Sequence, residues 1–259
     1  MMNKENELKQ LWLQEARRTF SGWDFAHIAA RTTEQPLPWD YRTAVQAAMS
    51  PSRQILDMGT GGGEFLLSLS PPPGRTYATE SYPPNVMLCQ ERLPAHGIEI
   101  RQVFDDNELP FPDESFDLVI NRHESYAAEE VYRILKPGGR FLTQQVGGMN
   151  NRELAGFVLG KETEASPIDR KFGLDQSAAA LQQAGFTIQE GHEFFPLLTF
   201  HDVGAFVYFA TIIEWEFPGF TVERCFPQLL ALQAVTERKG GFTSREHRFF
   251  LVAGKQLAS

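Results

Sequence analysis

The stretch that decides the fold is Ile55-Leu56-Asp57-Met58-Gly59-Thr60-Gly61-Gly62-Gly63-Glu64. A short apolar run at 55–58 ends at a cluster of glycines, and a helical pattern at 64–69 begins directly after them. Glycines there let the backbone turn tightly and let a ligand approach the main chain without a Cβ in the way. In an open α/β sheet, ligands bind at the carboxyl ends of the strands, where this loop falls. The stretch therefore predicts a strand, a ligand-binding loop and a helix, in preference to a plain glycine-rich turn.

Strand and helix patterns alternate from residue 53 onward. After the first strand, further strands are expected at 76–79, 98–104, 116–120, 140–146, 186–194 and 246–253. Helical patterns lie between many of them, at 83–95, 126–135 and 175–184. Repeated strand–helix–strand units are typical of a parallel sheet with helices on both faces. We predict an α/β, Rossmann-like fold with a seven-stranded, mostly parallel sheet.

Two regions fall outside this alternation. Residues 1–50 look helical and amphipathic and are expected to form an N-terminal lid segment. Residues 195–242 are rich in aromatic side chains and mostly helical in pattern, so an inserted cap is expected before the last strand. The ligand-binding domain would then comprise residues 51–194 and 243–259.

Composition restricts the classes of function. The chain has 24 basic and 33 acidic residues, a net charge of -9, which argues against a nucleic-acid partner because gripping phosphates needs a basic surface. The longest uncharged apolar stretch, at 203–213, is too short to span a bilayer, and the N-terminus lacks the pattern of a signal peptide. Cys89 and Cys225 lie far apart, so neither a disulfide framework nor a metal site is expected. We predict a cytoplasmic protein without a membrane partner.

The glycine loop also restricts the ligand. Counted from Gly59, the position that is Gly or Ala in the dinucleotide fingerprint is Glu64. An acid there would repel a pyrophosphate at the helix N-terminus, and no Gly-Lys-Ser/Thr sequence ends the loop. The loop therefore favours a ligand without phosphates, which weakens the alternative of a dinucleotide-dependent oxidoreductase.

The stretch from Asp57 to Gly63 resembles motif I of class I S-adenosylmethionine-dependent methyltransferases. Three further stretches extend the resemblance in the right order: Glu80 at the end of the second strand, the acidic segment 105–117, and the helix-to-strand hairpin 130–141. Within this superfamily the chain looks most like the small-molecule branch that includes quinone-biosynthesis methyltransferases.

The resemblance implies S-adenosylmethionine as cofactor, S-adenosylhomocysteine as product and a small-molecule methyl acceptor. Glu80 would hold the two ribose hydroxyls, as the family's acid does. Asp105 would accept from the adenine amino group, and the backbone at Asp106 would meet the ring. Position 106 is usually small and apolar in the family, which leaves open which of the two aspartates points at adenine. The cofactor-binding residues that the resemblance implies are Asp57, Gly59, Thr60, Gly61, Gly63, Glu80, Asp105, Asp106, Asn107 and Asn121.

Methyl transfer is an in-line displacement, so the protein mainly aligns the reactants, and an acceptor of high pKa would need a base. The segment 121–126 faces the cofactor in the family. His123, whose imidazole titrates near neutral pH, is the first candidate for a base or a hydrogen bond to the acceptor, and Glu124 is the second. Trp39, Tyr41 and Tyr126 are candidates for acceptor binding. The alternative for each is an ordinary residue satisfied by its neighbours.

Two further hypotheses stay open. A non-catalytic S-adenosylmethionine-binding module is compatible with the chain, because the acceptor side carries no diagnostic motif. An RNA methyltransferase is weakened by the net acidity and by the absence of an Asn/Asp-Pro-Pro-Tyr/Phe motif after the fourth strand. The identity of the acceptor and the oligomeric state cannot be inferred from the sequence.

Overall fold

The protein is described from a computed structural model that covers residues 4–20, 25–160 and 168–257. The chain divides into two compact units. The large unit comprises Pro38–Gly147, Phe172–Glu193 and Arg248–Ser259, and the small unit comprises Met1–Leu37, Gly148–Lys171 and Phe194–His247. Each unit is thus assembled from three separate segments of the chain.

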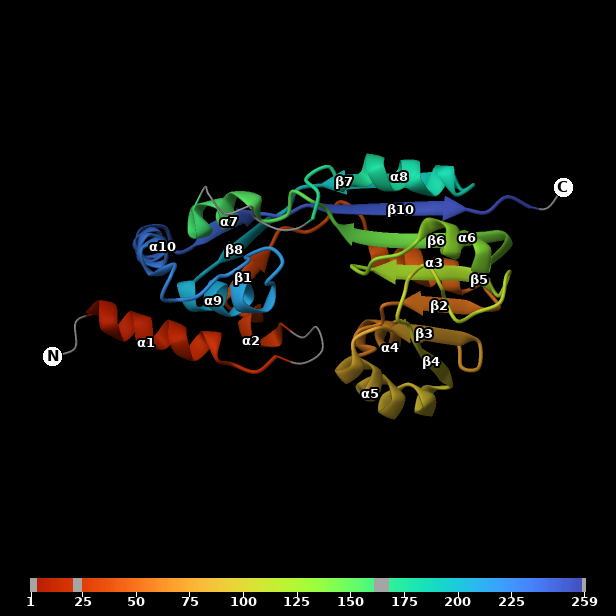
Figure 1. The fold of residues 1–259 in the computed structure, drawn as a ribbon, viewed down its shortest axis with the longest axis horizontal. Helices are drawn as coiled ribbons and strands as arrows, with labels where there is room; N and C mark the ends of the chain where they lie inside the picture. The colour runs from red at the N-terminus through yellow and green to blue at the C-terminus, as the bar shows by residue number, and fades with distance from the viewer. Residues whose placement is uncertain (1–3, 21–24, 161–167, 258–259) are drawn as a thin grey trace. The chain divides into compact units, whose positions relative to one another are not determined.

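The large unit contains a seven-stranded sheet in the order β4-β3-β2-β5-β6-β10-β7 (Figure 1). The strands are β2 (Ile55–Met58), β3 (Thr76–Glu80), β4 (Ile98–Gln102), β5 (Phe116–Arg122), β6 (Leu135–Val146), β7 (Thr187–Phe194) and β10 (Arg248–Gly254). The pairs β2–β3, β2–β5, β3–β4 and β5–β6 are parallel, whereas β10 runs antiparallel to β6. This confirms the predicted Rossmann-like α/β fold with a mostly parallel sheet.

Helices cover both faces of this sheet because neighbouring side chains of a strand point to opposite faces. Ile55 packs in a core with α3, α4 and α5, whereas the adjacent Leu56 packs in a second core with α6 and α8. The helices of the large unit are α3 (Tyr41–Met49), α4 (Glu64–Ser68), α5 (Pro83–Arg92), the short 3-10 helix η1 (Pro94–His96), α6 (Ala128–Ile134) and α8 (Leu174–Gln183).

The small unit is built around a three-stranded antiparallel sheet in the order β1-β8-β9. Its strands are β1 (Thr32–Glu34), β8 (Leu197–Phe200) and β9 (Phe242–Arg245). Its helices are α1 (Lys4–Ala16), α2 (Ala26–Ala29), α7 (Arg152–Leu159), α9 (Val203–Ile212) and α10 (Phe226–Lys239). The sequence analysis expected mostly helices in this region. Its strands are only three or four residues long, too short for an alternating pattern to stand out.

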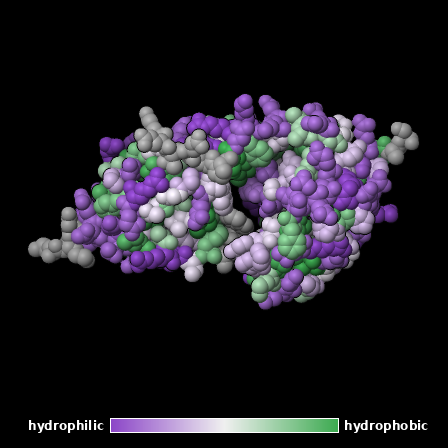
Figure 2. Space-filling view, viewed as in Figure 1, coloured by the Kyte–Doolittle hydropathy of each residue, from purple (hydrophilic) through white to green (hydrophobic). Residues whose placement is uncertain are grey.

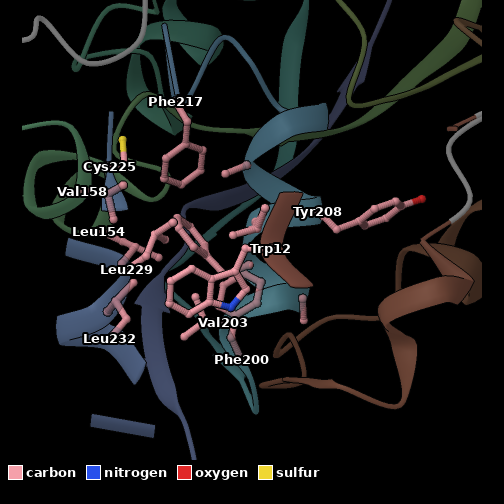
Figure 3. Packing of buried hydrophobic residues seen from close by; sticks show 14 of the residues in the cluster. Trp12, Leu154, Val158, Phe200, Val203, Tyr208, Phe217, Cys225, Leu229 and Leu232 are labelled. Carbon is pink, nitrogen blue, oxygen red and sulfur yellow. The ribbon is translucent and has the colours of Figure 1, made fainter. Parts of the chain in front are cut away.

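Aromatic and aliphatic side chains together form the core of the small unit (Figure 3). Trp12 of α1 belongs to the same buried cluster as Phe200, Phe206 and Phe217, which come from the segment 194–247. The N-terminal segment and the aromatic-rich insert therefore share one hydrophobic core. Burial in a common core explains why so many aromatic residues occur between residues 194 and 226.

The boundary of the expected lid differs from the boundary of the units. Residues 1–37 belong to the small unit, whereas α3 belongs to the large unit. Tyr41, Val45 and Met49 lie on one side of α3 and are buried against the sheet, which explains this placement. Whether the segments 1–50 and 195–242 act as a lid and a cap stays a prediction.

None of the helices in the described ranges combines the length and the apolar character that a bilayer crossing needs. On the face shown in Figure 2, hydrophilic and hydrophobic residues are interspersed over both units.

Candidate functional site

The glycine loop lies at the carboxyl end of β2, in the conformation for which its sequence is suited. Gly59, Gly61 and Gly63 have φ angles of 67°, 62° and 82°, in the left-handed region that side chains with a Cβ disfavour. The amide of Thr60 donates to the carbonyl of Thr79 on β3 (2.9 Å). The loop is thereby attached to the neighbouring strand before α4 begins.

Glu80, the last residue of β3, is the main side-chain anchor of this loop. Its buried carboxylate accepts hydrogen bonds from the backbone amides of Gly61 (2.7 Å), Ser81 (2.9 Å) and Tyr82 (2.9 Å). A carboxylate offers about four lone-pair positions, so Glu80 retains capacity to accept from a ligand. The structure therefore brings the glycine loop and the predicted ribose-binding acid into direct contact.

Cys89 of α5 contacts the main chain of the glycine loop. Its buried thiol donates to the carbonyl of Gly61 (3.0 Å). Burial, together with nearby carboxylates, raises the pKa of Cys89 to about 12, so the thiol stays protonated and keeps this bond. Cys89 thus stabilises the loop as a small core residue.

Asp57 lies on β2, directly below the loop, and is buried. Burial raises its pKa to about 7; the charge of Glu80 acts in the same direction, and the charge of Arg122 opposes it. A carboxyl group with this pKa changes its charge near neutral pH, and a nearby cation would favour the ionised form.

Acidic side chains surround a small pocket beside the loop. Its lining comprises Met58, Gly59, Thr79, Glu80, Ser81, Val103, Asp106 and Glu124. Glu124 lies so close to the main chain of Gly59 that a Cβ added there would be 2.3 Å from its Cγ. Burial raises the pKa of Glu124, with further contributions from the charges of Glu80 and Asp106. The pocket therefore favours a positively charged ligand.

The two aspartates that the sequence left unresolved differ in position. Asp106 lines the pocket, and its carboxylate accepts from the hydroxyl of Ser125 (2.5 Å). Asp105 is exposed, and its carboxylate accepts from the amide and the side chain of Asn107 (2.8 Å each). These hydrogen bonds lower the pKa of Asp105. The structure therefore brings Asp106 to the loop, whereas Asp105 and Asn107 bond to each other at the surface.

Asn121 lies near the end of β5, paired in register with Met58 of β2, and its side chain is fully buried. Its Oδ1 accepts from Thr143 (2.9 Å) and from Gln145 (2.5 Å). Its Nδ2 has no hydrogen-bond partner among the described residues. A buried donor without an acceptor is costly, and the acceptor can come from a ligand.

His123 follows β5 with a left-handed backbone, φ 60°. Its amide donates to the carbonyl of Gln144 (2.8 Å), and its Nε2 lies 3.3 Å from Nε2 of Gln144. The side chain remains exposed at the surface of the unit. Partial removal from water, together with the charges of Arg248 and Arg122, lowers the pKa of His123 well below its usual value. The imidazole is therefore neutral at pH 7.

The three candidates for acceptor binding lie in different surroundings. Tyr41 is buried, and its hydroxyl donates to the carbonyl of Asn121 (2.9 Å). Tyr126 packs its ring against Phe141 in the core beneath α6, and burial raises its pKa to about 12. Trp39 donates from Nε1 to the side-chain oxygen of Gln144 (2.9 Å), the residue whose amide contacts His123.

Gln144 and Gln145 were missed by the sequence analysis. Both are buried at the end of β6, and their amides contact the 121–124 segment. The available signal was a pair of adjacent amides near the end of an expected strand whose Phe141 and Leu142 indicate burial. Within the described part of the chain, no group of three or more His, Cys, Asp or Glu side chains could hold a metal ion.

Comparison with known proteins agrees with this geometry. A methyltransferase domain family matches residues 56–143. A probable phthiotriol/phenolphthiotriol dimycocerosates methyltransferase 2 of Mycobacterium ulcerans is 38% identical over 109 residues, which are 39% of this chain and 42% of that protein. A demethylmenaquinone methyltransferase of Thermus thermophilus is 33% identical over 116 residues, which are 41% of this chain and 53% of that protein. The chain thus matches only about half the length of these relatives.

Among solved structures, a putative methyltransferase from Bacillus halodurans has a similar fold. Its TM-score is 0.59 at 20% identity, over 84% of this chain and 99% of that one. The matched segment 56–143 contains the glycine loop, Glu80, Asp106 and the 121–124 segment. Sequence match and fold together confirm the resemblance: this segment is a methyltransferase domain of the class I, S-adenosylmethionine-dependent type.

Proposed function

We propose that this protein transfers the methyl group of S-adenosylmethionine to a small-molecule acceptor. The observation that carries the proposal is the acidic pocket of the large unit, where Gly59, Glu80 and Glu124 meet at the end of β2. The cofactor carries a sulfonium and an ammonium group against one carboxylate, so its net charge is positive. The carboxyl groups that line the pocket provide the complementary negative charge.

The residues at this edge of the sheet, in the pocket lining and next to it, fit the parts of this cofactor. Glu80, to which the resemblance assigns the ribose hydroxyls, would accept from them through the roughly one lone-pair position that its three backbone bonds leave. Asp106 would accept a hydrogen bond from the adenine amino group. The carboxylates of Asp57 and Glu124 suit the cationic end, and the unpartnered Nδ2 of Asn121 suits a carboxylate or carbonyl oxygen. Gly59, Thr60, Gly61 and Gly63 would place the main chain against the ligand.

When bound, the cofactor supplies an electrophilic methyl group on sulfur. The work of the chain is to align the acceptor with that methyl, as an in-line displacement demands. Glu124 lines the pocket and His123 precedes it on the segment after β5, and we assign both to the acceptor side. Because His123 is neutral at pH 7, it can form a hydrogen bond to the acceptor without a charge of its own.

A dinucleotide ligand is disfavoured by the same residues. A pyrophosphate at the start of α4 would meet Glu64, and the pocket beyond it is lined by Glu80, Asp106 and Glu124. The negative charges of a pyrophosphate and of these carboxylates would repel one another. A non-catalytic module that only binds S-adenosylmethionine would share this pocket, and turnover of an acceptor is what separates it from the enzyme.

The acceptor is proposed to be a small molecule, in line with the relatives named for phthiotriol dimycocerosates and demethylmenaquinone. Many aromatic side chains of the 195–242 segment are buried in the small unit, so their abundance does not define an acceptor surface. We keep the proposal that the segments 1–50 and 195–242 contribute to specificity. Two unpaired thiols, Cys89 and Cys225, support a reducing, cytoplasmic setting.

The first test is calorimetric titration with S-adenosylmethionine, S-adenosylhomocysteine and NAD. Both adenosyl compounds are expected to bind and NAD is not. In Glu80→Ala the affinity for both should fall about a hundredfold, because charged hydrogen bonds worth about 3 kcal/mol are lost.

Glu99→Ala is the matched control, because Glu99 lies on the neighbouring strand β4 with its side chain exposed and paired to Arg101. The Glu99→Ala protein should bind both adenosyl compounds with the affinity of the unmodified protein. Binding of NAD alone, or normal affinity in a folded Glu80→Ala protein, would overturn the cofactor assignment.

A further inference from the structure

We infer that Gln144 is a positioning residue that holds His123 in the tautomer with its proton on Nδ1, so that the imidazole offers the acceptor an N–H donor. The inference rests on the proposed function for its meaning, since His123 is assigned there to the acceptor side. Its structural content concerns only Trp39, Gln144 and His123, all of which lie in the large unit.

The chain of hydrogen bonds begins at Trp39. An indole N–H is a donor only. Nε1 of Trp39 lies 2.9 Å from Oε1 of Gln144, so this contact determines which end of the amide is the oxygen. The indole is itself held in place, stacked with His192 (6.0 Å between ring centroids) and with Phe250 (6.4 Å). The amide of Gln144 is therefore oriented by a donor that can bond only to its oxygen.

The amide then determines the state of the imidazole. With Oε1 toward Trp39, the NH₂ group of Gln144 faces His123, and its nitrogen lies 3.3 Å from Nε2 of the ring. An amide NH₂ is a donor only, so it forms this bond only if Nε2 carries no proton. A neutral imidazole with an unprotonated Nε2 has its proton on Nδ1. A second hydrogen bond, from the main-chain amide of His123 to the main-chain carbonyl of Gln144, joins the same two residues through their backbones.

The opposite side of the ring is available. No described residue forms a hydrogen bond with Nδ1 of His123, and the side chain is exposed. The guanidinium groups of Arg122 on β5 and Arg248 on β10 oppose a second proton on the ring, whereas Glu124 is the neighbouring acid along the chain. His123 thus remains a neutral donor near pH 7.

This tautomer has a consequence for the acceptor. A molecule that meets Nδ1–H must accept a hydrogen bond there, as a phenolate, enolate or carbonyl oxygen does and an ammonium group does not. The two nearby guanidinium groups favour the same class, because they attract negative charge and repel positive charge. His123 then serves as a hydrogen-bond donor to an oxygen of the acceptor, and Nε2 is unavailable as a general base.

The test is ¹⁵N NMR of the full-length protein with labelled histidine, with His123→Gln used to assign the signal. At pH 7.5 the expected spectrum has Nε2 unprotonated and Nδ1 protonated. In Gln144→Glu, one carboxylate oxygen still accepts from Trp39 and the other accepts from the ring. The proton should then move to Nε2, and the pKa of His123 should rise. Gln183→Glu, which adds the same charge at an exposed position of α8, should change neither.

Protonated Nε2 in the unmodified protein, or an unchanged tautomer in a folded Gln144→Glu protein, would overturn the inference. The measurement on the unmodified protein decides the question even if the variant does not fold. The readout needs neither cofactor nor acceptor, so its failure can be told apart from failure of the proposed function, which the titrations with S-adenosylmethionine test.

Discussion

Each unit contains a cluster of buried polar side chains, and the two clusters differ in how their groups are bonded. In the small unit, Glu216 is buried, and its two carboxylate oxygens accept from Asn150 and Asn151 (2.6 Å each). In the large unit, buried polar groups gather at the carboxyl ends of the strands. There, Nδ2 of Asn121 lacks a partner among the described residues, and Asp57 has a pKa near 7. A satisfied network stabilises a fold, whereas one with an open donor and a shifted pKa is arranged for a ligand.

The largest effect is expected from removing the carboxylate of the small unit. Glu216→Ala leaves the amides of Asn150 and Asn151 buried without acceptors, which should lower the free energy of unfolding by about 3 kcal/mol. Urea denaturation measures this loss. Affinity for S-adenosylmethionine, measured where the protein is still folded, should stay within about twofold. A large loss of cofactor affinity with intact stability would break the comparison.

A smaller effect is expected from His123 in the large unit. His123→Gln should lower kcat by about thirtyfold once an acceptor is known, because a hydrogen bond to the reacting molecule is lost. Binding of S-adenosylmethionine should not change. Steady-state kinetics with the unmodified protein alongside provides the measurement. Unchanged turnover would show that His123 is an ordinary loop residue.

The pH dependence of cofactor binding should sharpen the comparison. Asp57, with a pKa near 7, ionises as the pH rises from 6 to 8, and its negative charge attracts a cationic ligand. Affinity for S-adenosylmethionine should therefore rise up to about tenfold over that range and then level off. In Asp57→Asn the affinity for S-adenosylmethionine should be weaker, and it should change less with pH. The raised pKa of Glu124 acts in the same direction, so Glu124→Gln is needed to separate the two contributions.

The same shift has the opposite effect on stability. The folded protein keeps the proton of Asp57 up to about pH 7, whereas the unfolded chain loses it near pH 4. Folding is therefore favoured by this group at low pH, and its contribution falls as the pH rises from about 4 to 7. Thermal or urea unfolding of the ligand-free protein, compared with Asp57→Asn, should show this decline only where Asp57 is present.

The smallest effect is expected at the start of α4. Glu64 is exposed and pairs with Arg92 (2.8 Å), an arrangement worth well under 1 kcal/mol. Glu64→Gln should change S-adenosylmethionine affinity by less than about twofold. Calorimetry with NAD on the same variant should still show no binding, since Glu80, Asp106 and Glu124 remain. Appearance of NAD binding would mean that Glu64 alone excluded dinucleotides.

Much of the large unit could be predicted because its signals are local. The run 55–58, the glycines after it and the acid at the end of β3 are close in sequence, and the structure confirms the sheet built around them. The small unit was harder to predict. β1 pairs with β8 through contacts such as Thr32 with Phe200, far apart in the chain, and periodicity reports nothing about such pairs.

The candidate site shows the same division. Gly59 could be named from the sequence because ligands bind at the carboxyl ends of parallel strands, and the family resemblance pointed to Glu80 and the 121–124 segment. The preference for Asp106 over Asp105 at the pocket depends on which way each side chain turns, which Ser125 and Asn107 decide through hydrogen bonds. Such orientations are properties of the packed structure.

By itself, the sequence determined the sheet and the glycine loop, because backbone preference and hydrophobic alternation act between near neighbours. The class of cofactor followed from the resemblance of its motifs to a known family. Only the tertiary structure decided which segments share the core of the small unit. It alone decided that Trp39, Gln144 and His123 form one hydrogen-bonded series. The physical reason is that burial and hydrogen bonding join groups that are distant along the chain. Such contacts produce no periodic pattern in the sequence.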